Sequence, residues 1–481
     1  MIVVSITGAR RIVLAVAVLA VAVAAQASPA GAATNVHKLW MAGYAAPGTP
    51  ERLDKVGIIK IGSSKAKNVL VIEPGTSGGG AYFIPFAKWL VEKQPGWQVW
   101  AVERRENRLE DQSQLNRFKR GEVTAQQFFR YYLGYLAEPS DPEHHLHPVS
   151  PQAAVADGAR GWGMNVAVQD LHVVVEAAKA LGGKVVLGGH SLGGTVVTAY
   201  ATWDFGGKPG ANGLSGLVFD DGGSNPVPIS SGEAETALTT LAGKSPWLAF
   251  GGIGAPELGL FSTTGSALAA FDPNELSQAE SFPYLPGILK PKNGKGEQVP
   301  ATNEATFAYG VSVGTSPPNL VAAQVHAGAG IKEAGPGEPW VWNGTGAITP
   351  AKRFAEMLSG TGVLGADGSE WYFPERLTID TGAIANGNAN PAQTVLGEQA
   401  IHGHELPSTL HILAINSELD TLFGGGFDTL KFAEALAEQS KIPSGNVTTV
   451  NVAGTYAHND PNGAYPENEL MNHLVPFLEG L

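Results

Sequence analysis

The stretch that decides the fold is Val185-Val186-Leu187-Gly188-Gly189-His190-Ser191-Leu192-Gly193-Gly194-Thr195-Val196-Val197, in which an apolar run breaks at a G-x-S-x-G pattern and then resumes. This pattern predicts a strand, a tight turn with Ser191 at its apex, and a helix. Gly189 and Gly193 flank the serine because so sharp a turn brings the flanking backbone segments together, where a Cβ would clash. The following helix directs its free N–H groups and positive dipole end at Ser191, which favours an oxyanion there. The pattern therefore predicts that Ser191 is a nucleophile.

Length and composition indicate a globular protein with a large core. The chain has 481 residues, too many for one average domain, and its apolar content of 43% is ample for a buried interior with insertions. The chain contains no cysteine, which excludes disulfides, cysteine-ligated metals, a cysteine nucleophile and a lipid anchor on cysteine. Because 31 Lys and Arg face 44 Asp and Glu, the charge balance disfavours nucleic acid and anionic membrane surfaces as main partners.

The N-terminal segment has the pattern of a secretory signal peptide. Arg10 and Arg11 precede an apolar stretch from residue 12 to 25, and small residues follow with A-x-A-like sites before residue 34. The apolar stretch is shorter than the roughly 20 residues that a spanning helix needs. We therefore predict that residues 1–33 direct export and that no stable membrane span remains after cleavage, with an uncleaved anchor as the alternative.

The rest of the chain alternates between strand-like and helix-like patterns in two regions, 34–225 and 401–481, separated by a region of different character. Strands and helices alternate in both outer regions, which is typical of an α/β fold with a mostly parallel, doubly wound sheet. The expected strands are 68–72, 97–102, 185–190, 216–219, 410–416 and 447–452, and the expected helices are 164–181 and 427–439.

The chain resembles the α/β-hydrolase superfamily over residues 66–225 and 405–481, on the strength of Gly189-His190-Ser191-Leu192-Gly193 and the strands around it. In that superfamily the nucleophile, the acid and the histidine follow in this order along the chain. The resemblance implies that Asp420, in the loop after the strand 410–416, is the acid. It also implies that His458, in the loop after the last strand, is the general base.

Other residues compete for the role of the acid. Asp220 and Asp221 end the strand that begins at Gly216, and some relatives of the superfamily place the acid there. Glu418 lies two residues from Asp420 and could replace it. His190 is interpreted as a residue that packs the turn and not as a catalyst.

The resemblance also implies an oxyanion hole with two backbone donors. The N–H of Leu192 is one of them, since it follows the nucleophile. The second is expected in the glycine-rich loop after the strand 68–72, where the chain reads Glu73-Pro74-Gly75-Thr76-Ser77-Gly78-Gly79-Gly80. Pro74 stands where the family usually has histidine, and the N–H of Thr76 is the expected donor, with that of Ser77 as the alternative.

Two insertions interrupt the core pattern. Residues 226–400 are apolar but contain many glycines and prolines, and they fall where the superfamily inserts a cap above the catalytic edge of the sheet. We expect a mainly helical cap, with helices at 231–242 and 349–358, that covers Ser191 and favours an apolar substrate. The second insertion, 103–163, opens with the charged run 103–108, which is interpreted as a solvated loop with Arg105 bracing the rim of the site.

The sequence gives no support for a metal or a cofactor. The histidine clusters at 144–147 and 402–404 lack helical spacing with a third ligand, and Asp460-Pro461-Asn462-Gly463 is interpreted as a turn because it lacks the closing glutamate of a calcium loop. No dinucleotide fingerprint or phosphate loop is present. We therefore expect neither a metal nor a cofactor.

These observations favour a secreted serine hydrolase that cleaves carboxylic esters, including lipid-like ones, with an apolar acyl or alcohol part. Serine as the nucleophile disfavours the epoxide and halide branches of the superfamily, which use aspartate. An exported aminopeptidase or acyltransferase is the enzymatic alternative. A non-catalytic surface binding protein on the same fold is the alternative from a different class.

Overall fold

The computed structural model describes residues 35–137, 155–250, 252–282, 290–419 and 427–481. Within these residues the largest sheet has eight strands in the order β1-β2-β4-β3-β5-β6-β11-β12. Strand β2 pairs antiparallel with both β1 and β4, and every other pair in this sheet is parallel. The strands are β1 (Val36–Ala42), β2 (Lys55–Gly62), β3 (Asn68–Glu73), β4 (Trp97–Glu103), β5 (Val185–His190), β6 (Gly216–Asp220), β11 (His411–Asn416) and β12 (Val447–Asn451).

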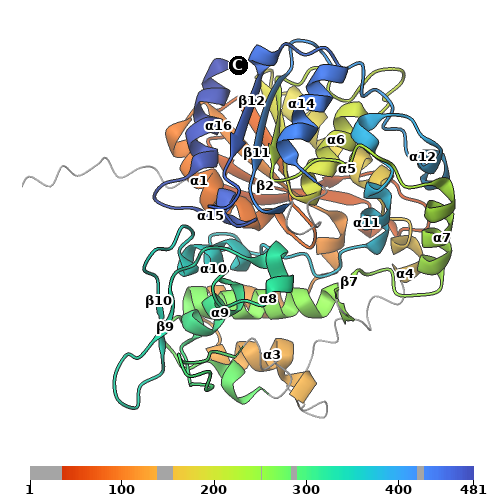
Figure 1. Cartoon of the computed structure of the whole chain (residues 1–481). Helices are drawn as coiled ribbons and strands as arrows, with labels where there is room; N and C mark the ends of the chain where they lie inside the picture. Colours follow the sequence, from red (N-terminus) through yellow and green to blue (C-terminus); the bar gives the residue numbers. More distant parts are fainter. Residues whose placement is uncertain (1–34, 138–154, 251, 283–289, 420–426) are drawn as a thin grey trace, which may run out of the picture. The chain divides into compact units, whose positions relative to one another are not determined.

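Helices cover both faces of this sheet (Figure 1). Successive side chains of a strand point to opposite faces, so Leu70 and Ile72 join one apolar cluster while Val69 and Val71 join the other. Helices α1 and α16 contribute to the first cluster, and α5, α6 and α14 contribute to the second. The bounds are α1 (Ile84–Lys93), α5 (Met164–Lys179), α6 (Leu192–Thr202), α14 (Thr429–Gln439) and α16 (Glu469–Gly480).

The predicted fold class, a mostly parallel doubly wound α/β sheet, is confirmed. All six expected strands and both expected core helices are present, with ends shifted by no more than two residues. Strands β1 and β2, which precede the first expected strand, were not predicted from the sequence. Five of the seven residues of β1 are only partly buried and two are exposed, so the strand lacks the buried apolar run that marks the central strands.

In the described part of the segment between β6 and β11, which holds the 226–400 insertion, the regular secondary structure is mainly helical. Helix α7 has the predicted bounds, because Ser230 and Glu233 form a capping box at its start. The helix expected at 349–358 begins two residues later, with Pro350 at its N-cap. The helices are α7 (Ser231–Ala242), α8 (Ala255–Phe271), α9 (Asn303–Val311), α10 (Ala351–Ser359), α11 (Glu375–Thr381) and α12 (Pro391–Leu396), and the short strand pairs are β7 (Ala249–Phe250) with β8 (Ile253–Gly254) and β9 (Gly330–Lys332) with β10 (Val341–Asn343).

The two insertions pack together and against the sheet. Helix α3 (Ala125–Ala137) of the first insertion contacts α8 of the second, where Phe128 and Leu260 belong to one apolar cluster. Phe354 of α10 belongs to the same cluster as Ile72 of the sheet, so the 226–400 insertion and the core share buried apolar side chains. No helix in the described part of the chain is long and apolar enough to span a membrane.

The interpretation of residues 103–108 as a solvated loop is wrong for 103–107, and only Arg108 of this run is exposed. Arg104 and Arg105 are 5% and 1% exposed, and the neighbouring carboxyl and amide side chains of the run are buried as well. Arg105 pairs with Asp54 and Asp170 at 2.8 and 2.7 Å. Each buried guanidinium has carboxylate partners, which is how charged groups are tolerated in an interior.

Candidate active site

Ser191 lies at the apex of a strained turn between β5 and α6, as predicted. Its φ of 57° and ψ of −128° are unusual for a residue with a side chain. The flanking glycines are required, since a Cβ on Gly189 would lie 2.3 Å from the backbone of Gly193, and one on Gly193 would lie 2.2 Å from the carbonyl oxygen of Glu73. The backbone N–H of Ser191 donates to the carbonyl oxygen of Asp220 at 3.0 Å, which ties the turn to the end of β6.

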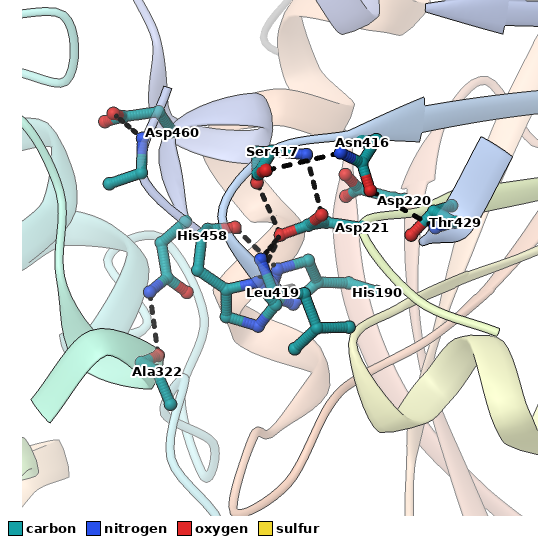
Figure 2. A network of polar contacts seen from close by, with 12 residues as sticks. His190, Asp220, Asp221, Ala322, Asn416, Ser417, Leu419, Thr429, His458 and Asp460 are labelled. Carbon is teal, nitrogen blue, oxygen red and sulfur yellow. Dashed lines mark hydrogen bonds and ion pairs between the residues drawn. The ribbon is translucent and has the colours of Figure 1, made fainter. Parts of the chain in front are cut away.

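His458 is buried in the loop after β12, where its Nδ1 donates to Oδ2 of Asp221 at 2.6 Å (Figure 2). Asp221 directly follows β6 and has a φ of 45°. A carboxylate on Nδ1 holds an imidazole in the tautomer whose Nε2 accepts a proton, and stabilises the imidazolium once it forms. Asp221 and His458 therefore have the geometry that the acid and the base of a catalytic triad require.

Three further donors hold the Asp221 carboxylate in place. The N–H of Ser417 donates to Oδ1 at 2.7 Å, the N–H of Leu419 donates to Oδ2 at 3.0 Å, and the Ser417 hydroxyl also donates to Oδ2. Burial raises the pKa of Asp221. The hydrogen bonds from His458 and Ser417, together with the charge of His458, lower this pKa by more than burial raises it, so the pKa lies below its ordinary value. Asp221 is thus ionised at neutral pH and oriented toward His458.

The other candidate acids occupy different places. Asp420, which the sequence analysis favoured as the acid, lies outside the described residues, and the position expected of it, on Nδ1 of His458, is held by the alternative Asp221. The Asp220 side chain accepts from Nδ2 of Asn462 at 2.5 Å and is not paired with His458. Glu418 is half-buried beside the segment that binds Asp221.

His190 connects the nucleophile turn to the histidine loop. Its ring stacks on that of His458, with centroids 4.5 Å apart, and also on that of Tyr82, with centroids 5.6 Å apart. Its Nε2 donates to the carbonyl oxygen of His458 at 3.0 Å. Burial, together with the charge of His458, lowers the pKa of His190 to about 3, so this ring stays neutral. His190 packs the turn, as expected, and because it directly precedes Ser191 it also holds the His458 ring and backbone next to the nucleophile turn.

The predicted oxyanion donors lie on either side of the Ser191 turn. Leu192 is the first residue of α6, and a Cβ placed on Gly75 would lie 2.8 Å from Cβ of Ser191 and 3.4 Å from its hydroxyl oxygen. Thr76 follows Gly75 directly, and within the described residues neither the Thr76 N–H nor the Leu192 N–H has an acceptor. Ser77, the alternative donor, has a φ of 53°. The loop after β3 therefore contacts the nucleophile, as the sequence predicts.

These features together decide the fold. The mostly parallel sheet, the strained serine after β5 and the histidine after the last strand are the arrangement that the sequence resemblance implied, and the carboxylate on the histidine follows β6, the position that some relatives use for the acid. The chain has the α/β-hydrolase fold.

Comparisons with known proteins place several hydrolases of this fold among the similar solved structures. A putative lipase from Sulfolobus solfataricus is 13% identical with a TM-score of 0.46, covering 92% of this chain and 93% of that one. The monoglyceride lipase of Saccharomyces cerevisiae is 12% identical with a TM-score of 0.34 over 92% and 93%, and a haloalkane dehalogenase from Bradyrhizobium elkanii is 11% identical with a TM-score of 0.39 over 93% and 97%. No family model and no curated protein matches the sequence.

Of the two histidine clusters, the structure describes only the one at 402–404. Residues 144–147 lie outside the described part of the chain. His402 lies between Asp204 and Glu405, with ring nitrogens 3.1 and 2.9 Å from their carboxylates, and His404 contacts the carbonyl oxygen of Gln439. Among the described residues no group of three or more histidine, aspartate or glutamate side chains is arranged to hold a metal.

Two contacts at the site were not foreseen from the sequence. Asp460 is buried in the helical turn α15 (Asp460–Gly463), where a simple turn was expected, and it accepts from the N–H of Ala457 and from His326 of the 226–400 insertion. Arg104 donates to the carbonyl oxygens of Pro74 and Gly75. The only sequence signal for these contacts was position: Asp460 lies two residues after His458, and Arg104 directly follows β4.

Proposed function

We propose that this chain is a serine hydrolase that cleaves carboxylic esters through a triad of Ser191, His458 and Asp221. The observation that carries the proposal is the 2.6 Å hydrogen bond from His458 Nδ1 to Asp221. The His458 ring also stacks on His190, the residue before the strained serine. A neutral imidazole with its Nδ1 proton fixed in this way presents Nε2 as the base that a serine hydroxyl needs.

In the proposed reaction, Ser191 Oγ attacks the ester carbonyl carbon while its proton passes to Nε2 of His458. The N–H groups of Leu192 and Thr76 donate to the tetrahedral oxyanion, and Asp221 stabilises the imidazolium. His458 then gives the proton to the leaving alcohol, which departs and leaves an acyl-enzyme. A water molecule, deprotonated by His458, then attacks the acyl carbon; the bond from this carbon to Ser191 Oγ breaks, Oγ takes the proton from His458, and the acid is released.

The apolar composition of the 226–400 insertion, which we expect to act as a cap, supports a substrate with an apolar acyl or alcohol part. An exported aminopeptidase or an acyltransferase would use the same triad, and a binding protein on this fold would lack turnover. Export through residues 1–33 is part of the proposal and is tested by sequencing the N-terminus of the mature protein from the culture medium.

The deciding experiment is labelling with a fluorophosphonate, followed by peptide mapping. We expect the label on Ser191 in the wild type and none in Ser191→Ala, which should lose on the order of 10⁴-fold or more in turnover while remaining folded. Retention of a tenth of the activity in this variant would exclude Ser191 as the nucleophile.

The substrate class is tested with chromogenic esters of increasing chain length beside aminoacyl anilides. We expect hydrolysis of the esters, with preference for the longer apolar chains. Activity on the anilides alone would replace the esterase proposal with a peptidase, and labelling without any turnover in water would favour an acyltransferase.

A further inference from the structure

Arg104 is a buried cation placed against the loop that follows β3. Its Nε donates to Oε1 of Glu73 at 2.8 Å, and its Nη1 donates to Oε2 of Glu370 at 2.6 Å. The same guanidinium reaches the carbonyl oxygen of Gly75 from Nη1 and Nη2, at 3.3 and 3.4 Å, and Nη2 also donates to the carbonyl oxygen of Pro74. Arg104 therefore holds two successive peptide groups of this loop.

The geometry of the peptide bond turns these contacts into a constraint on Thr76. The carbonyl oxygen of Gly75 and the N–H of Thr76 belong to one planar trans peptide unit, in which they point in opposite directions. A guanidinium that fixes the carbonyl oxygen on one side therefore fixes the direction of the N–H on the other. Hydrogen bonding of the oxygen to a cation also polarises the unit and strengthens its N–H as a donor.

The 226–400 insertion completes this arrangement from the other side. The N–H of Glu370 donates to the carbonyl oxygen of Ser77 at 2.7 Å, and the N–H of Gly79 donates to that of Gly368 at 3.0 Å. Ser77 and Gly79 are thus paired by backbone hydrogen bonds with the same short segment whose Glu370 side chain binds Arg104. Glu370 is fully buried, so its contact with Arg104 is shielded from solvent.

We propose that Arg104, anchored by Glu73 from the sheet and by Glu370 from the 226–400 insertion, is a positioning residue for the oxyanion hole. It acts through the Gly75–Thr76 peptide and does not itself touch the substrate. The insertion thereby has a second role besides shaping a pocket, because it supplies one of the two carboxylates that hold the arginine. This inference rests on the proposed function in that it takes the Thr76 N–H as an oxyanion donor.

Arg105 provides a matched control within the same chain. It is the next residue, is equally buried, and also binds two carboxylates, Asp54 and Asp170, together with the carbonyl oxygen of Tyr44. None of these partners belongs to the loop 73–79. Lysine at either position keeps the positive charge but loses the planar fork that bridges several acceptors.

The test compares Arg104→Lys with Arg105→Lys, and Glu370→Ala with Asp170→Ala, which removes the corresponding carboxylate from Arg105. Each variant is treated with an apolar trifluoromethyl ketone, labelled with 13C at the carbonyl carbon. Ser191 Oγ adds to this carbon and its proton passes to His458, so that the hemiketal oxygen occupies the oxyanion position. NMR titration gives the pKa of the hemiketal hydroxyl, and hydrogen exchange gives the protection of the Thr76, Ser77 and Gly79 amides.

For Arg104→Lys and Glu370→Ala we expect the hemiketal pKa to rise by about one unit or more, because the oxyanion is less well stabilised. We also expect faster exchange at Thr76, and a kcat for esters about tenfold to a hundredfold lower, with KM changed less than about threefold. For Arg105→Lys and Asp170→Ala we expect wild-type values of the hemiketal pKa and of the exchange rates.

Equal effects in the two pairs of variants would overturn the inference, and so would wild-type values in the Arg104 pair. If Arg104→Lys does not fold, Glu370→Ala decides by the same criteria. If the wild type forms no hemiketal at all, the proposed function fails, whereas the exchange rate of the Gly79 amide, which donates to Gly368 in the free protein, still decides whether Arg104 positions the loop.

Discussion

Asp220 and Asp221 are adjacent residues at the end of one strand, yet their environments shift their pKa values in opposite directions. Asp221 binds His458 and has a lowered pKa. Burial raises the pKa of Asp220 well above its ordinary value, although the hydrogen bond from Asn462 lowers it in part. A carboxyl whose burial favours the neutral form is well replaced by an amide. An ionised one that orients a histidine is not.

We therefore expect Asp221→Asn to lower kcat by up to about 10⁴-fold, because an amide presents the wrong partner to His458 Nδ1. Asp220→Asn should lower kcat much less, since the carboxamide is neutral and of the same shape. Steady-state kinetics on a chromogenic ester measures both. The reverse ranking would remove Asp221 from the triad, and a fully active Asp221→Asn would return the role to Asp420.

His190 gives a second prediction for a single residue. His190→Phe keeps a ring to stack on His458 but removes the Nε2 donor to the His458 carbonyl oxygen. The loss of one hydrogen bond, about 0.5–1.5 kcal/mol, should lower kcat by about threefold to tenfold. Because the pKa of His190 is about 3, the pH profile above pH 4 should keep its shape. A shift of the acid limb in His190→Phe would show that His190 titrates with the reaction.

At the scale of elements, the loop that carries His458 is joined to the 226–400 insertion through Asp460. Its carboxylate accepts from Nδ1 of His326 at 2.6 Å, from the Thr349 hydroxyl at 2.6 Å and from the N–H of Ala457 at 2.8 Å. The hydrogen bond to Asp460 raises the pKa of His326, which outweighs the lowering by burial, and Glu418 adds a smaller raising effect. His326 therefore links the insertion to the catalytic loop most strongly when it is protonated.

A raised histidine pKa contributes stability that is fully present below the unfolded-state value of about 6.5 and is lost as pH rises through the folded-state value. We thus expect His326→Gln to lower the free energy of unfolding more at pH 5.5 than at pH 9, as measured by urea denaturation. His473→Gln on α16, where the ring is 3.8 Å from Glu469, is the control and should show a smaller difference between the two pH values. A pH-independent effect of His326→Gln would contradict the charged contact.

The elements also show what the sequence could predict. The central strands are continuous apolar runs, and the glycines around Ser191 and after β3 are demanded by close backbone contacts, so the sheet, the nucleophile and its loop could be inferred from local pattern. The acid could not, because Asp221 and Asp420 both follow a strand and both lie between Ser191 and His458 in the chain order. The burial of Arg104 depends on Glu73 and Glu370, partners that are distant in sequence and that no local pattern reveals.

At the scale of the whole molecule, the 226–400 insertion and the sheet are expected to unfold together. Phe354 of α10 is 1% exposed, and it packs in one continuous apolar cluster with residues of the sheet and of α1. An insertion that was only a mobile lid would bury its apolar side chains within itself. Shared burial couples the free energies of the two parts, because neither can open without exposing side chains of the other to water.

We expect Phe354→Ala to lower the free energy of unfolding by about 3–5 kcal/mol, the usual cost of removing a buried phenylalanine ring. The loss should appear as one shifted transition, identical by far-UV circular dichroism and by tryptophan fluorescence, since the insertion and the sheet both contain tryptophans. Leu364→Ala is the control, because Leu364 is 49% exposed in the same insertion and its removal should cost little. Two separate transitions, with only the first shifted by Phe354→Ala, would show that the insertion is an independent unit, and would leave Arg104 anchored by Glu73 alone whenever the insertion opens.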